Sequence, residues 1–280
     1  MSDEPIIEVR NLKYTFPNGT MALNGIDVDI SRGEFIGIIG QNGSGKTTLV
    51  KNLSGLLTPP AGAIRVNGKD VTTITQGSLS TIVGYVFQNP DYMLYNMSVR
   101  DEVAAGPKNI GLPSEEIEKR IQMALTHVNL LNRKDLYPFH LPVGEKQRVG
   151  IASILVMKPS VIIVDEPTTG QDVRQSYVIM ELLKKLNNEE GKTVIIITHD
   201  MRMVAEYARR AIVMSRGKIL LDDETGNVFT RTKILEEAFV RPPQITQLAQ
   251  RTTSYGFSAG VLSVKQMYEN LASLCEKKDR

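Results

Sequence analysis

The sequence predicts an α/β fold with a core of parallel strands, a more antiparallel N-terminal β subdomain and an inserted helical subdomain. Short apolar runs of strand length recur along the chain, and several are apolar throughout, as strands buried on both faces should be. Helical patterns alternate with these runs in the second half of the chain. The expected strands cover residues 6–9, 26–30, 35–39, 64–66, 82–87, 161–164, 194–198, 211–214 and 218–221.

Helices are expected where apolar residues repeat every three to four positions. The stretch after Pro113 begins Ser-Glu-Glu, a favourable helix start, and places Ile117, Ile121, Leu125 and Val128 on one face. The expected helices cover residues 48–53, 114–128, 173–188, 201–209 and 263–277.

Two features of the chain indicate its division into parts. Residues 89–157 read as almost all helix and loop, which predicts a helical subdomain of about that extent. Arg241-Pro242-Pro243 interrupts the pattern near the end of the chain. We therefore expect one domain over residues 1–240 and a C-terminal extension over residues 241–280.

Composition excludes several classes of protein. The chain has 280 residues, 41% of them hydrophobic, which is enough for one large domain or a domain with a small appendage. The single cysteine, Cys275, excludes an internal disulfide and fits a reducing cytosol. No signal peptide is recognised, and no apolar run approaches the ~20 residues that span a bilayer. We therefore expect a soluble chain. The net charge of +2 by itself argues neither for nor against nucleic acid, but no Lys/Arg block or basic surface is evident, and we expect no nucleic-acid partner.

Residues 40–47 fit a phosphate-binding loop, in which Gly, four residues and Gly precede Lys and then Ser or Thr. The loop follows an apolar run and precedes a helical pattern, so its N–H groups can point at phosphate oxygens. Lys46 would neutralise the terminal phosphates and the Thr47 hydroxyl would bind Mg²⁺. A glycine-rich turn without a ligand is the alternative, and the order of strand, loop, Lys and Thr argues against it. The expected nucleotide-binding residues are Gly40, Gln41, Asn42, Gly43, Ser44, Gly45, Lys46, Thr47 and Thr48.

Polar residues end three of the other apolar runs. One run ends at Asp165 and Glu166, of which one carboxylate can hold Mg²⁺ and the other can orient or deprotonate a water. A second run ends before His199, where strand ends in open α/β sheets face the ligand crevice. This position favours a γ-phosphate contact over an ordinary surface or core histidine. A third run ends at Gln88, whose amide can bond Mg²⁺-bound water.

The order of these motifs resembles the ATP-binding cassette (ABC) ATPase family, which has the P-loop NTPase fold with a RecA-like parallel core. The resemblance covers roughly residues 6–240. It implies an ATPase that uses ATP and Mg²⁺, with Asp172 in the aspartate loop. The resemblance further assigns the β/γ-phosphates to Lys46, Mg²⁺ to Thr47, Asp165 and Gln88, the general base to Glu166 and the γ-phosphate contact to His199.

The family also stacks the adenine ring on an aromatic side chain near the N-terminus. Phe16 occupies this position in the register of the motif, and Tyr14 is the rival. An ordinary turn aromatic remains an alternative for either residue.

The sequence departs from the family at the signature peptide, which is usually Leu-Ser-Gly-Gly-Gln and here reads Leu-Pro-Val-Gly-Glu over residues 141–145. In the family this peptide opens a helix and presents its hydroxyl and N–H groups to ATP held by the opposite subunit. Pro142 offers neither group, and Val143 places a branched side chain where glycine is usual. Gly144 and the helix dipole remain, while Glu145 adds a negative charge near the phosphates.

We expect this departure to make a pair of subunits asymmetric. At least two anion contacts are weakened, each worth ~1.5–3 kcal/mol for a charge-assisted hydrogen bond. The phosphate loop of this chain would work opposite an intact signature, so a heterodimer with a second ABC ATPase is favoured over a homodimer. A tolerated variant with full activity is the alternative.

Two stretches resemble the ATPases of energy-coupling factor importers, which take up cobalt, nickel or vitamins. These are residues 87–113, from Phe-Gln-Asn-Pro-Asp to Gly-Leu-Pro, and the tail that begins Arg-Pro-Pro at residue 241. The resemblance implies a peripheral protein on the cytoplasmic face of the cell membrane. Its partners would be a second ATPase, a transmembrane coupling protein and a substrate-binding membrane subunit.

In that architecture, short helices of the coupling protein sit in a groove near the Gln loop. Tyr92, Met93, Leu94, Tyr95 and Met97 suit such a groove, or alternatively cover the helical subdomain's own core. Two other functions stay open. One is a soluble ABC protein outside transport, which the lack of sustained heptads disfavours. The other is a regulatory nucleotide-binding subunit with weak hydrolysis.

Overall fold

In the computed structural model, which describes residues 4–278, six strands form the larger sheet. They are β3 (Phe35–Ile39), β6 (Val83–Val86), β7 (Val161–Asp165), β8 (Thr193–Ile197), β9 (Arg210–Ser215) and β10 (Lys218–Glu224). Their order across the sheet is β10-β9-β3-β8-β7-β6. Every neighbouring pair from β9 to β6 is parallel, and β10 is antiparallel to β9.

Side chains of the central strands alternate between two apolar clusters, because successive residues of a strand point to opposite faces of the sheet. In β3, Phe35 and Ile39 join one cluster and Ile36 and Ile38 join the other. The same alternation holds along β7 and β8, all of whose residues are buried. The continuously apolar runs in the sequence are therefore strands covered on both faces.

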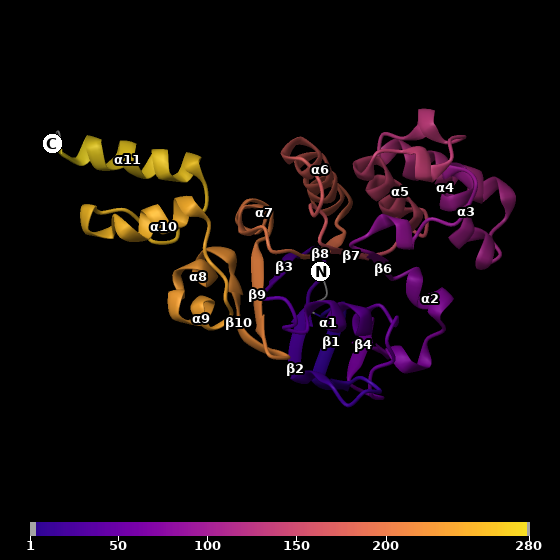
Figure 1. Ribbon diagram of the computed structural model, residues 1–280, viewed down its shortest axis with the longest axis horizontal. Helices are drawn as coiled ribbons and strands as arrows, with labels where there is room; N and C mark the ends of the chain where they lie inside the picture. The colour runs from indigo at the N-terminus through magenta and orange to yellow at the C-terminus, as the bar shows by residue number, and fades with distance from the viewer. Residues whose placement is uncertain (1–3, 279–280) are drawn as a thin grey trace.

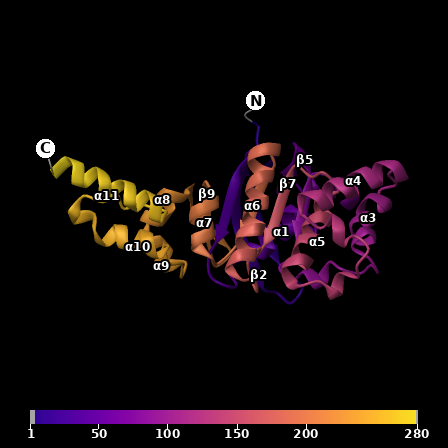
Figure 2. The same cartoon turned by 90° about the horizontal axis from the view of Figure 1, so that it is seen from above.

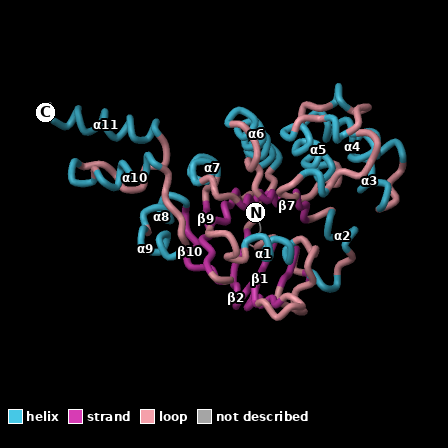
Figure 3. Tube along the Cα trace, in the orientation of Figure 1, coloured by secondary structure: helices cyan, strands magenta, loops and turns pink. Residues whose placement is uncertain are grey.

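Different elements cover the two faces. One face packs against α6 (Val173–Glu190), α7 (Met201–Tyr207) and the helical region, by which we mean α3 (Val99–Asn109), α4 (Ser114–His127) and α5 (Val143–Leu155). The other face packs against α1 (Lys46–Leu53) and a smaller sheet, and α1 lies between the two sheets (Figure 3). The smaller sheet is antiparallel, with strands β1 (Ile7–Thr15), β2 (Met21–Ile30), β4 (Ile64–Val66) and β5 (Lys69–Asp70) in the order β2-β1-β4-β5.

The predicted α/β class is confirmed, and the predicted strands differ from the observed ones mainly in the smaller sheet. Strands β1 and β2 are longer than the predicted ranges 6–9 and 26–30. The prediction missed their outer residues because these alternate between buried and exposed. Such half-exposed stretches lack the continuous apolar run that marks a doubly covered strand. Strand β5 has two residues, which is too short for a sequence pattern.

Helices gather at the two ends of the molecule's long axis (Figures 1 and 2). At one end, α3, α4 and α5 pack together. At the other end, α10 and α11 lie side by side beyond α8 and α9. The helices are α2 (Gln76–Ser80), α3 (Val99–Asn109), α4 (Ser114–His127), α5 (Val143–Leu155), α8 (Thr225–Thr230), α9 (Thr232–Glu237), α10 (Gln244–Arg251) and α11 (Val264–Lys278).

The five side chains expected to suit a docking groove divide into two groups. Leu94 is buried and Met93 packs against the same apolar cluster, so these two belong to the protein's own core. Tyr92, Tyr95 and Met97 are largely exposed. Only this second group is accessible to a partner.

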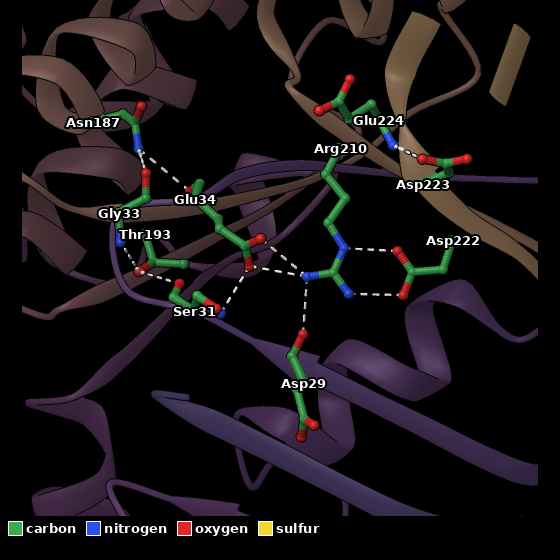
Figure 4. A network of polar contacts seen from close by, with 10 residues as sticks. All are labelled: Asp29, Ser31, Gly33, Glu34, Asn187, Thr193, Arg210, Asp222, Asp223 and Glu224. Atoms are coloured by element: carbon green, nitrogen blue, oxygen red, sulfur yellow. Dashed lines mark hydrogen bonds and ion pairs between the residues drawn. The ribbon is translucent and has the colours of Figure 1, made fainter. Parts of the chain in front are cut away.

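Arg210, the first residue of β9, connects the two sheets (Figure 4). Its Nε and Nη2 atoms donate to the two carboxylate oxygens of Asp222 on β10, at 2.6 and 2.7 Å. Its Nη1 atom donates to both carboxylate oxygens of Glu34 at 3.0 and 3.1 Å, and to the carbonyl oxygen of Asp29 on β2 at 2.9 Å. These charge-assisted hydrogen bonds, led by those to Asp222, raise the pKa of Arg210.

Replacing Arg210 with Met removes this link and leaves Asp222 and Glu34 without their shared cation. The three side chains are each only about a quarter exposed, so we expect the free energy of unfolding to fall by about 2–3 kcal/mol. Urea unfolding measures this change. Arg10→Met is the matched control, because Arg10 also donates twice to a carboxylate, that of Asp29, but is 52% exposed and should cost less. Equal losses in the two variants would contradict the role given to Arg210.

Candidate functional site

The loop between β3 and α1 has no room for side chains at two of its glycines. Gly40 has a φ of 145°, and a Cβ atom there would lie 2.1 Å from the carbonyl oxygen of Met214. Gly45 caps α1 with a φ of 102°, and a Cβ atom would lie 2.7 Å from the carbonyl oxygen of Ala22. The loop is thus packed against β2 and β9 and begins α1 with a fixed shape, as the sequence motif requires.

Lys46 extends across this loop. Its Nζ atom donates to the carbonyl oxygens of Gly40 and Gln41 at 2.8 and 2.9 Å. Burial lowers the pKa of Lys46, and the nearby carboxylates of Glu166 and Asp165 oppose that effect. The ammonium group is held at the centre of the loop, where an anionic ligand would complete its solvation.

Ser44 carries a buried hydroxyl in the same loop. The residue is 1% exposed, and its Oγ atom has no hydrogen-bond partner among residues 4–278. A buried polar atom without a partner is uncommon in proteins. Its position beside Gly40 and Lys46 fits a loop whose polar groups complete their bonding with ligand oxygens.

Asp165, at the end of β7, accepts two side-chain hydrogen bonds on one oxygen. The hydroxyl of Thr47 donates to Asp165 Oδ2 at 3.0 Å, and the hydroxyl of Tyr85 donates to the same atom at 2.8 Å. Burial raises the pKa of Asp165, and these two hydrogen bonds act in the opposite direction. Asp165 and Thr47 were predicted from the sequence as site residues, and Tyr85 was not.

Tyr85 reaches Asp165 because of the register between two strands. It lies on β6 opposite Ile163 of β7, and Asp165 follows Ile163 by two residues on the same face of the sheet. The only signal in the sequence is the two-residue spacing of Tyr85 and Phe87 before Gln88. That spacing does not reveal which strand is the neighbour.

Glu166 follows Asp165 with a left-handed backbone, at a φ of 51°. Its amide donates to the carbonyl oxygen of Ile197 at 2.8 Å, which ties the turn to the end of β8. Its Oε2 atom accepts from the hydroxyl of Thr169 at 3.1 Å and lies 2.8 Å from Nδ1 of His199. A strained backbone at a buried carboxylate is a common feature of functional sites.

A cavity of about 520 Å³ brings most of the predicted residues together. Phe16 lies at its wall, while Tyr14 packs against Phe16 edge to face, with ring centroids 5.2 Å apart, and joins the core. Gln88 is exposed and lines the same cavity. The predicted residues that line it are Phe16, Asn42, Gly43, Gly45, Lys46, Thr47, Thr48, Gln88, Asp165 and Glu166.

His199 lies on the other side of the phosphate loop. It lines a separate cavity of about 480 Å³ together with Gly40, Gln41 and Asn42. Its side chain is 70% exposed and does not line the first cavity, but its Nδ1 atom contacts Glu166, which does. The histidine and the carboxylate therefore form a pair at the edge of the loop.

The signature residues Gly144 and Glu145 do not line this cavity. They lie in the first turn of α5, where Pro142 is the N-cap residue and offers its carbonyl oxygen but no side-chain cap. Val143 is half exposed. The helix therefore begins without the hydroxyl group that a serine would supply at this position.

The charge of Glu145 is directed into the helical region. Its Oε2 atom lies 3.8 Å from Nε of Arg133, and its Oε1 atom lies 3.9 Å from Nη2 of Arg148. The two arginines balance the carboxylate locally. These two ion pairs oppose the negative charge of Glu145 within the chain, and its buried Oε2 atom has no hydrogen-bond partner among residues 4–278.

A divalent cation would find a small set of hard oxygen donors at this site. Thr47 Oγ1 and the Asp165 carboxylate lie side by side, and Gln88 lines the same cavity. Among the described residues, no group of three or more His, Cys, Asp or Glu side chains could hold a metal ion. The donors fit Mg²⁺, which binds few protein oxygens and keeps waters and phosphates as its other ligands.

Asp172 caps α6, since its carboxylate accepts from the amide of Gln175 at 2.8 Å.

No helix within residues 4–278 has the length and apolar character needed to cross a membrane. In the C-terminal extension, the Thr246 hydroxyl donates to the carbonyl oxygen of Val261 at 2.6 Å, which links two parts of the extension. The Gln250 side-chain amide donates to the carbonyl oxygen of Phe229 in α8 at 2.7 Å, which links the extension to the rest of the chain.

Comparison with known proteins identifies the family. The family model described as ABC transporter matches residues 23–169. The energy-coupling factor transporter ATP-binding protein EcfA of Methanothermobacter thermautotrophicus is 39% identical over 273 residues, covering 96% of this chain and 87% of the relative. A putative ABC transporter ATP-binding protein of Caldanaerobacter subterraneus is 44% identical over 246 residues, or 88% of this chain, which matches 43% of that relative's length.

Solved structures lead to the same family. CbiO1 of Clostridium perfringens, part of the ABC transporter complex CbiONQ, superposes with a TM-score of 0.75 and 38% identity, over 88% of this chain and 99% of that one. The ATP-binding cassette MJ0796, as a post-hydrolysis dimer bound to ADP and Pi, gives a TM-score of 0.70 and 28% identity, over 78% of this chain and 98% of that one. The chain thus belongs to the ABC transporter family of ATPases, in the group that includes the energy-coupling factor ATP-binding proteins.

Proposed function

We propose that this chain is the ATP-hydrolysing part of an importer of energy-coupling factor type, which takes up a metal ion or a vitamin through membrane partners. The observation that carries the proposal is the convergence of Lys46, Asp165 and Glu166 at the ends of β3 and β7, around one cavity. A cation, a metal-binding carboxylate and a candidate base in this arrangement suit phosphoryl transfer to water.

ATP would lie along the loop with its base toward Phe16. The loop amides, the Ser44 hydroxyl and Lys46 would bind the phosphate oxygens, helped by the N-terminus of α1. Thr47, Asp165 and Gln88 would hold Mg²⁺, which supplies charge neutralisation at the β- and γ-phosphates when bound.

Glu166 is our candidate for the general base. Its carboxylate would accept a proton from a water that attacks the γ-phosphorus, while the bond to the β–γ bridging oxygen breaks. His199 and Thr169 both contact Glu166 Oε2 and would fix its orientation. His199 would also contact the γ-phosphate once the nucleotide brings that group to the edge of the loop.

The membrane partners would dock beside the Gln loop, where Tyr92, Tyr95 and Met97 expose apolar surface. In this proposal the chain would be a peripheral protein on the cytoplasmic face of the membrane. CbiO1 is part of a transporter complex by its description, which supports an assembly of the same kind here.

We further propose that this chain pairs with a second ABC ATPase whose signature is intact. The start of α5 lacks a side-chain cap and carries an exposed Val143, so it is poorly suited to bind ATP held by a copy of the same chain. Its own phosphate loop has the full set of residues. The heterodimer would then contain one active site and one slower site.

Replacing Glu166 with Gln removes the base and keeps the shape of the side chain. We expect phosphate release to fall by at least about 100-fold, the usual effect of losing a general base, with ATP binding retained. Phosphate release and equilibrium binding of Mg²⁺-ATP measure the two effects. Glu189→Gln on the exposed surface of α6 is the control. If Glu166→Gln hydrolyses ATP as fast as this control, Glu166 is not the base.

Replacing Phe16 with Ala removes the stacking surface for the base. We expect the Kd for ATP to rise about tenfold, since stacking of a base on an aromatic ring contributes about 1–3 kcal/mol. Binding of inorganic tripolyphosphate, which has no base, should not change. Tyr255→Ala, at an exposed aromatic residue in the extension, serves as the control. An equal loss of tripolyphosphate affinity would show that Phe16 acts on the loop and not on the base.

Restoring the usual signature tests the asymmetry. In the chain alone, Pro142→Ser with Val143→Gly should raise ATP hydrolysis about tenfold, because it returns one hydroxyl and one amide donor to the phosphates. Steady-state phosphate release measures the change. Pro113→Ser is a matched control, since Pro113 is the N-cap residue of α4 and likewise provides no side-chain cap. Rapid hydrolysis by the unaltered chain, with no gain in the double variant, would rule the asymmetry out.

A further inference from the structure

Tyr85 is a buried phenol at the candidate cation site that no part of the family's motif pattern accounts for. The residue is 6% exposed and lies on β6, all of whose residues are buried. Its hydroxyl donates to Asp165 Oδ2 at 2.8 Å, the same oxygen that accepts from Thr47 at 3.0 Å. Two donors on one oxygen fix both the position and the rotation of the carboxylate.

The phenol itself has little freedom to move. Its ring packs edge to face against Phe87, with ring centroids 4.8 Å apart and planes at 81°. Its backbone is paired with Ile163 in the parallel ladder between β6 and β7. Thr47, in contrast, is only half-buried and lies on the first turn of α1. Tyr85 is therefore the rigid donor of the two.

The remaining oxygen of the carboxylate is the one available to a cation. Both side-chain donors that Asp165 meets within the described residues bind Oδ2, and neither binds Oδ1. Groups that hydrogen-bond a metal-binding side chain orient it and tune its affinity for the metal. The hydroxyl of Tyr85 has the geometry of such a group.

We propose that Tyr85 is a positioning residue for the cation site, where its hydroxyl holds the Asp165 carboxylate in the orientation that presents Oδ1 to Mg²⁺. The inference rests on the proposed function, in which Mg²⁺ accompanies ATP. It adds a side chain from within β6 to a site to which the segment after β6 otherwise contributes Gln88.

Tyr207 provides a matched control within the same chain. It is also 6% exposed, and its hydroxyl also donates to a carboxylate oxygen, Oε1 of Glu181, at 2.8 Å. Its ring packs near Phe35 in the cluster on the opposite face of the sheet from α1. Tyr207→Phe thus removes a similar hydrogen bond far from the phosphate loop.

The experiment compares Tyr85→Phe with Tyr207→Phe in the full chain. Mn²⁺ replaces Mg²⁺ as the probe, and its binding in the presence of ADP is followed by the loss of the free-ion electron paramagnetic resonance signal. We expect Tyr85→Phe to raise the half-saturating Mn²⁺ concentration about tenfold, as is usual for the loss of a group that supports a metal ligand. ADP affinity in EDTA should stay unchanged, and Tyr207→Phe should change neither quantity.

Three outcomes would overturn the proposal. If Tyr85→Phe and Tyr207→Phe bind Mn²⁺ equally well, the hydroxyl does not support the cation site. If Tyr85→Phe weakens ADP binding equally in EDTA, the hydroxyl acts on the loop or the fold. If the unaltered chain binds ADP but no Mn²⁺ with it, the cation site of the proposed function is absent and the role of Tyr85 falls with it.

A folding defect can be separated from these results. Thermal unfolding of both tyrosine variants without ligand should show that each still folds, with the larger loss in Tyr85→Phe, because the Tyr85–Asp165 hydrogen bond is buried and the Tyr207–Glu181 hydrogen bond is only partly buried. Should Tyr85→Phe not fold, Tyr85→Met keeps an apolar side chain in the same space and is measured in the same way. A tenfold rise in half-saturating Mn²⁺ for Tyr85→Met supports the proposal, and an unchanged value overturns it.

Discussion

Burial of the central strands on both faces is the constraint on which the site depends. Strands β3, β7 and β8 send alternate side chains into two cores, so they have no surface of their own for polar groups. The polar side chains of the site follow the carboxyl ends of these strands, and parallel strands end at the same edge of the sheet. The phosphate loop, Asp165 with Glu166, and His199 follow β3, β7 and β8 in turn, and this is why they meet.

The polar groups at this edge hold one another in place. Lys46 donates to two loop carbonyls, Asp165 accepts from two hydroxyls, and Glu166 contacts Thr169 and His199. Each arrangement holds a charged or polar group in place where water is largely excluded. Fixed groups of this kind need little reorganisation during a reaction, which favours phosphoryl transfer driven by position and charge.

The signature peptide, residues 141–145, lies at the start of α5, which belongs to the helical region and not to the sheet edge that carries this site (Figure 1). Gly144 and Glu145 do not line the cavity around Lys46, and in the proposed pairing they would contact a nucleotide held by the second chain. The ion pairs of Glu145 with Arg133 and Arg148 shift attention to Pro142 and Val143 as the unusual positions. Any asymmetry between paired subunits would thus come from a missing cap and an exposed branched side chain, not from added charge.

The α/β class, the central strands and the residues at the strand ends could be predicted from the sequence, because each depends on a local pattern of apolar runs, glycines and acids. Which of these groups contact one another could not be predicted, because it depends on the three-dimensional packing. Tyr85 reaches Asp165 through the register of β6 and β7, Leu94 enters the core while Tyr95 does not, and Tyr14 packs behind Phe16. Such contacts join residues far apart in the chain, so no local pattern encodes them.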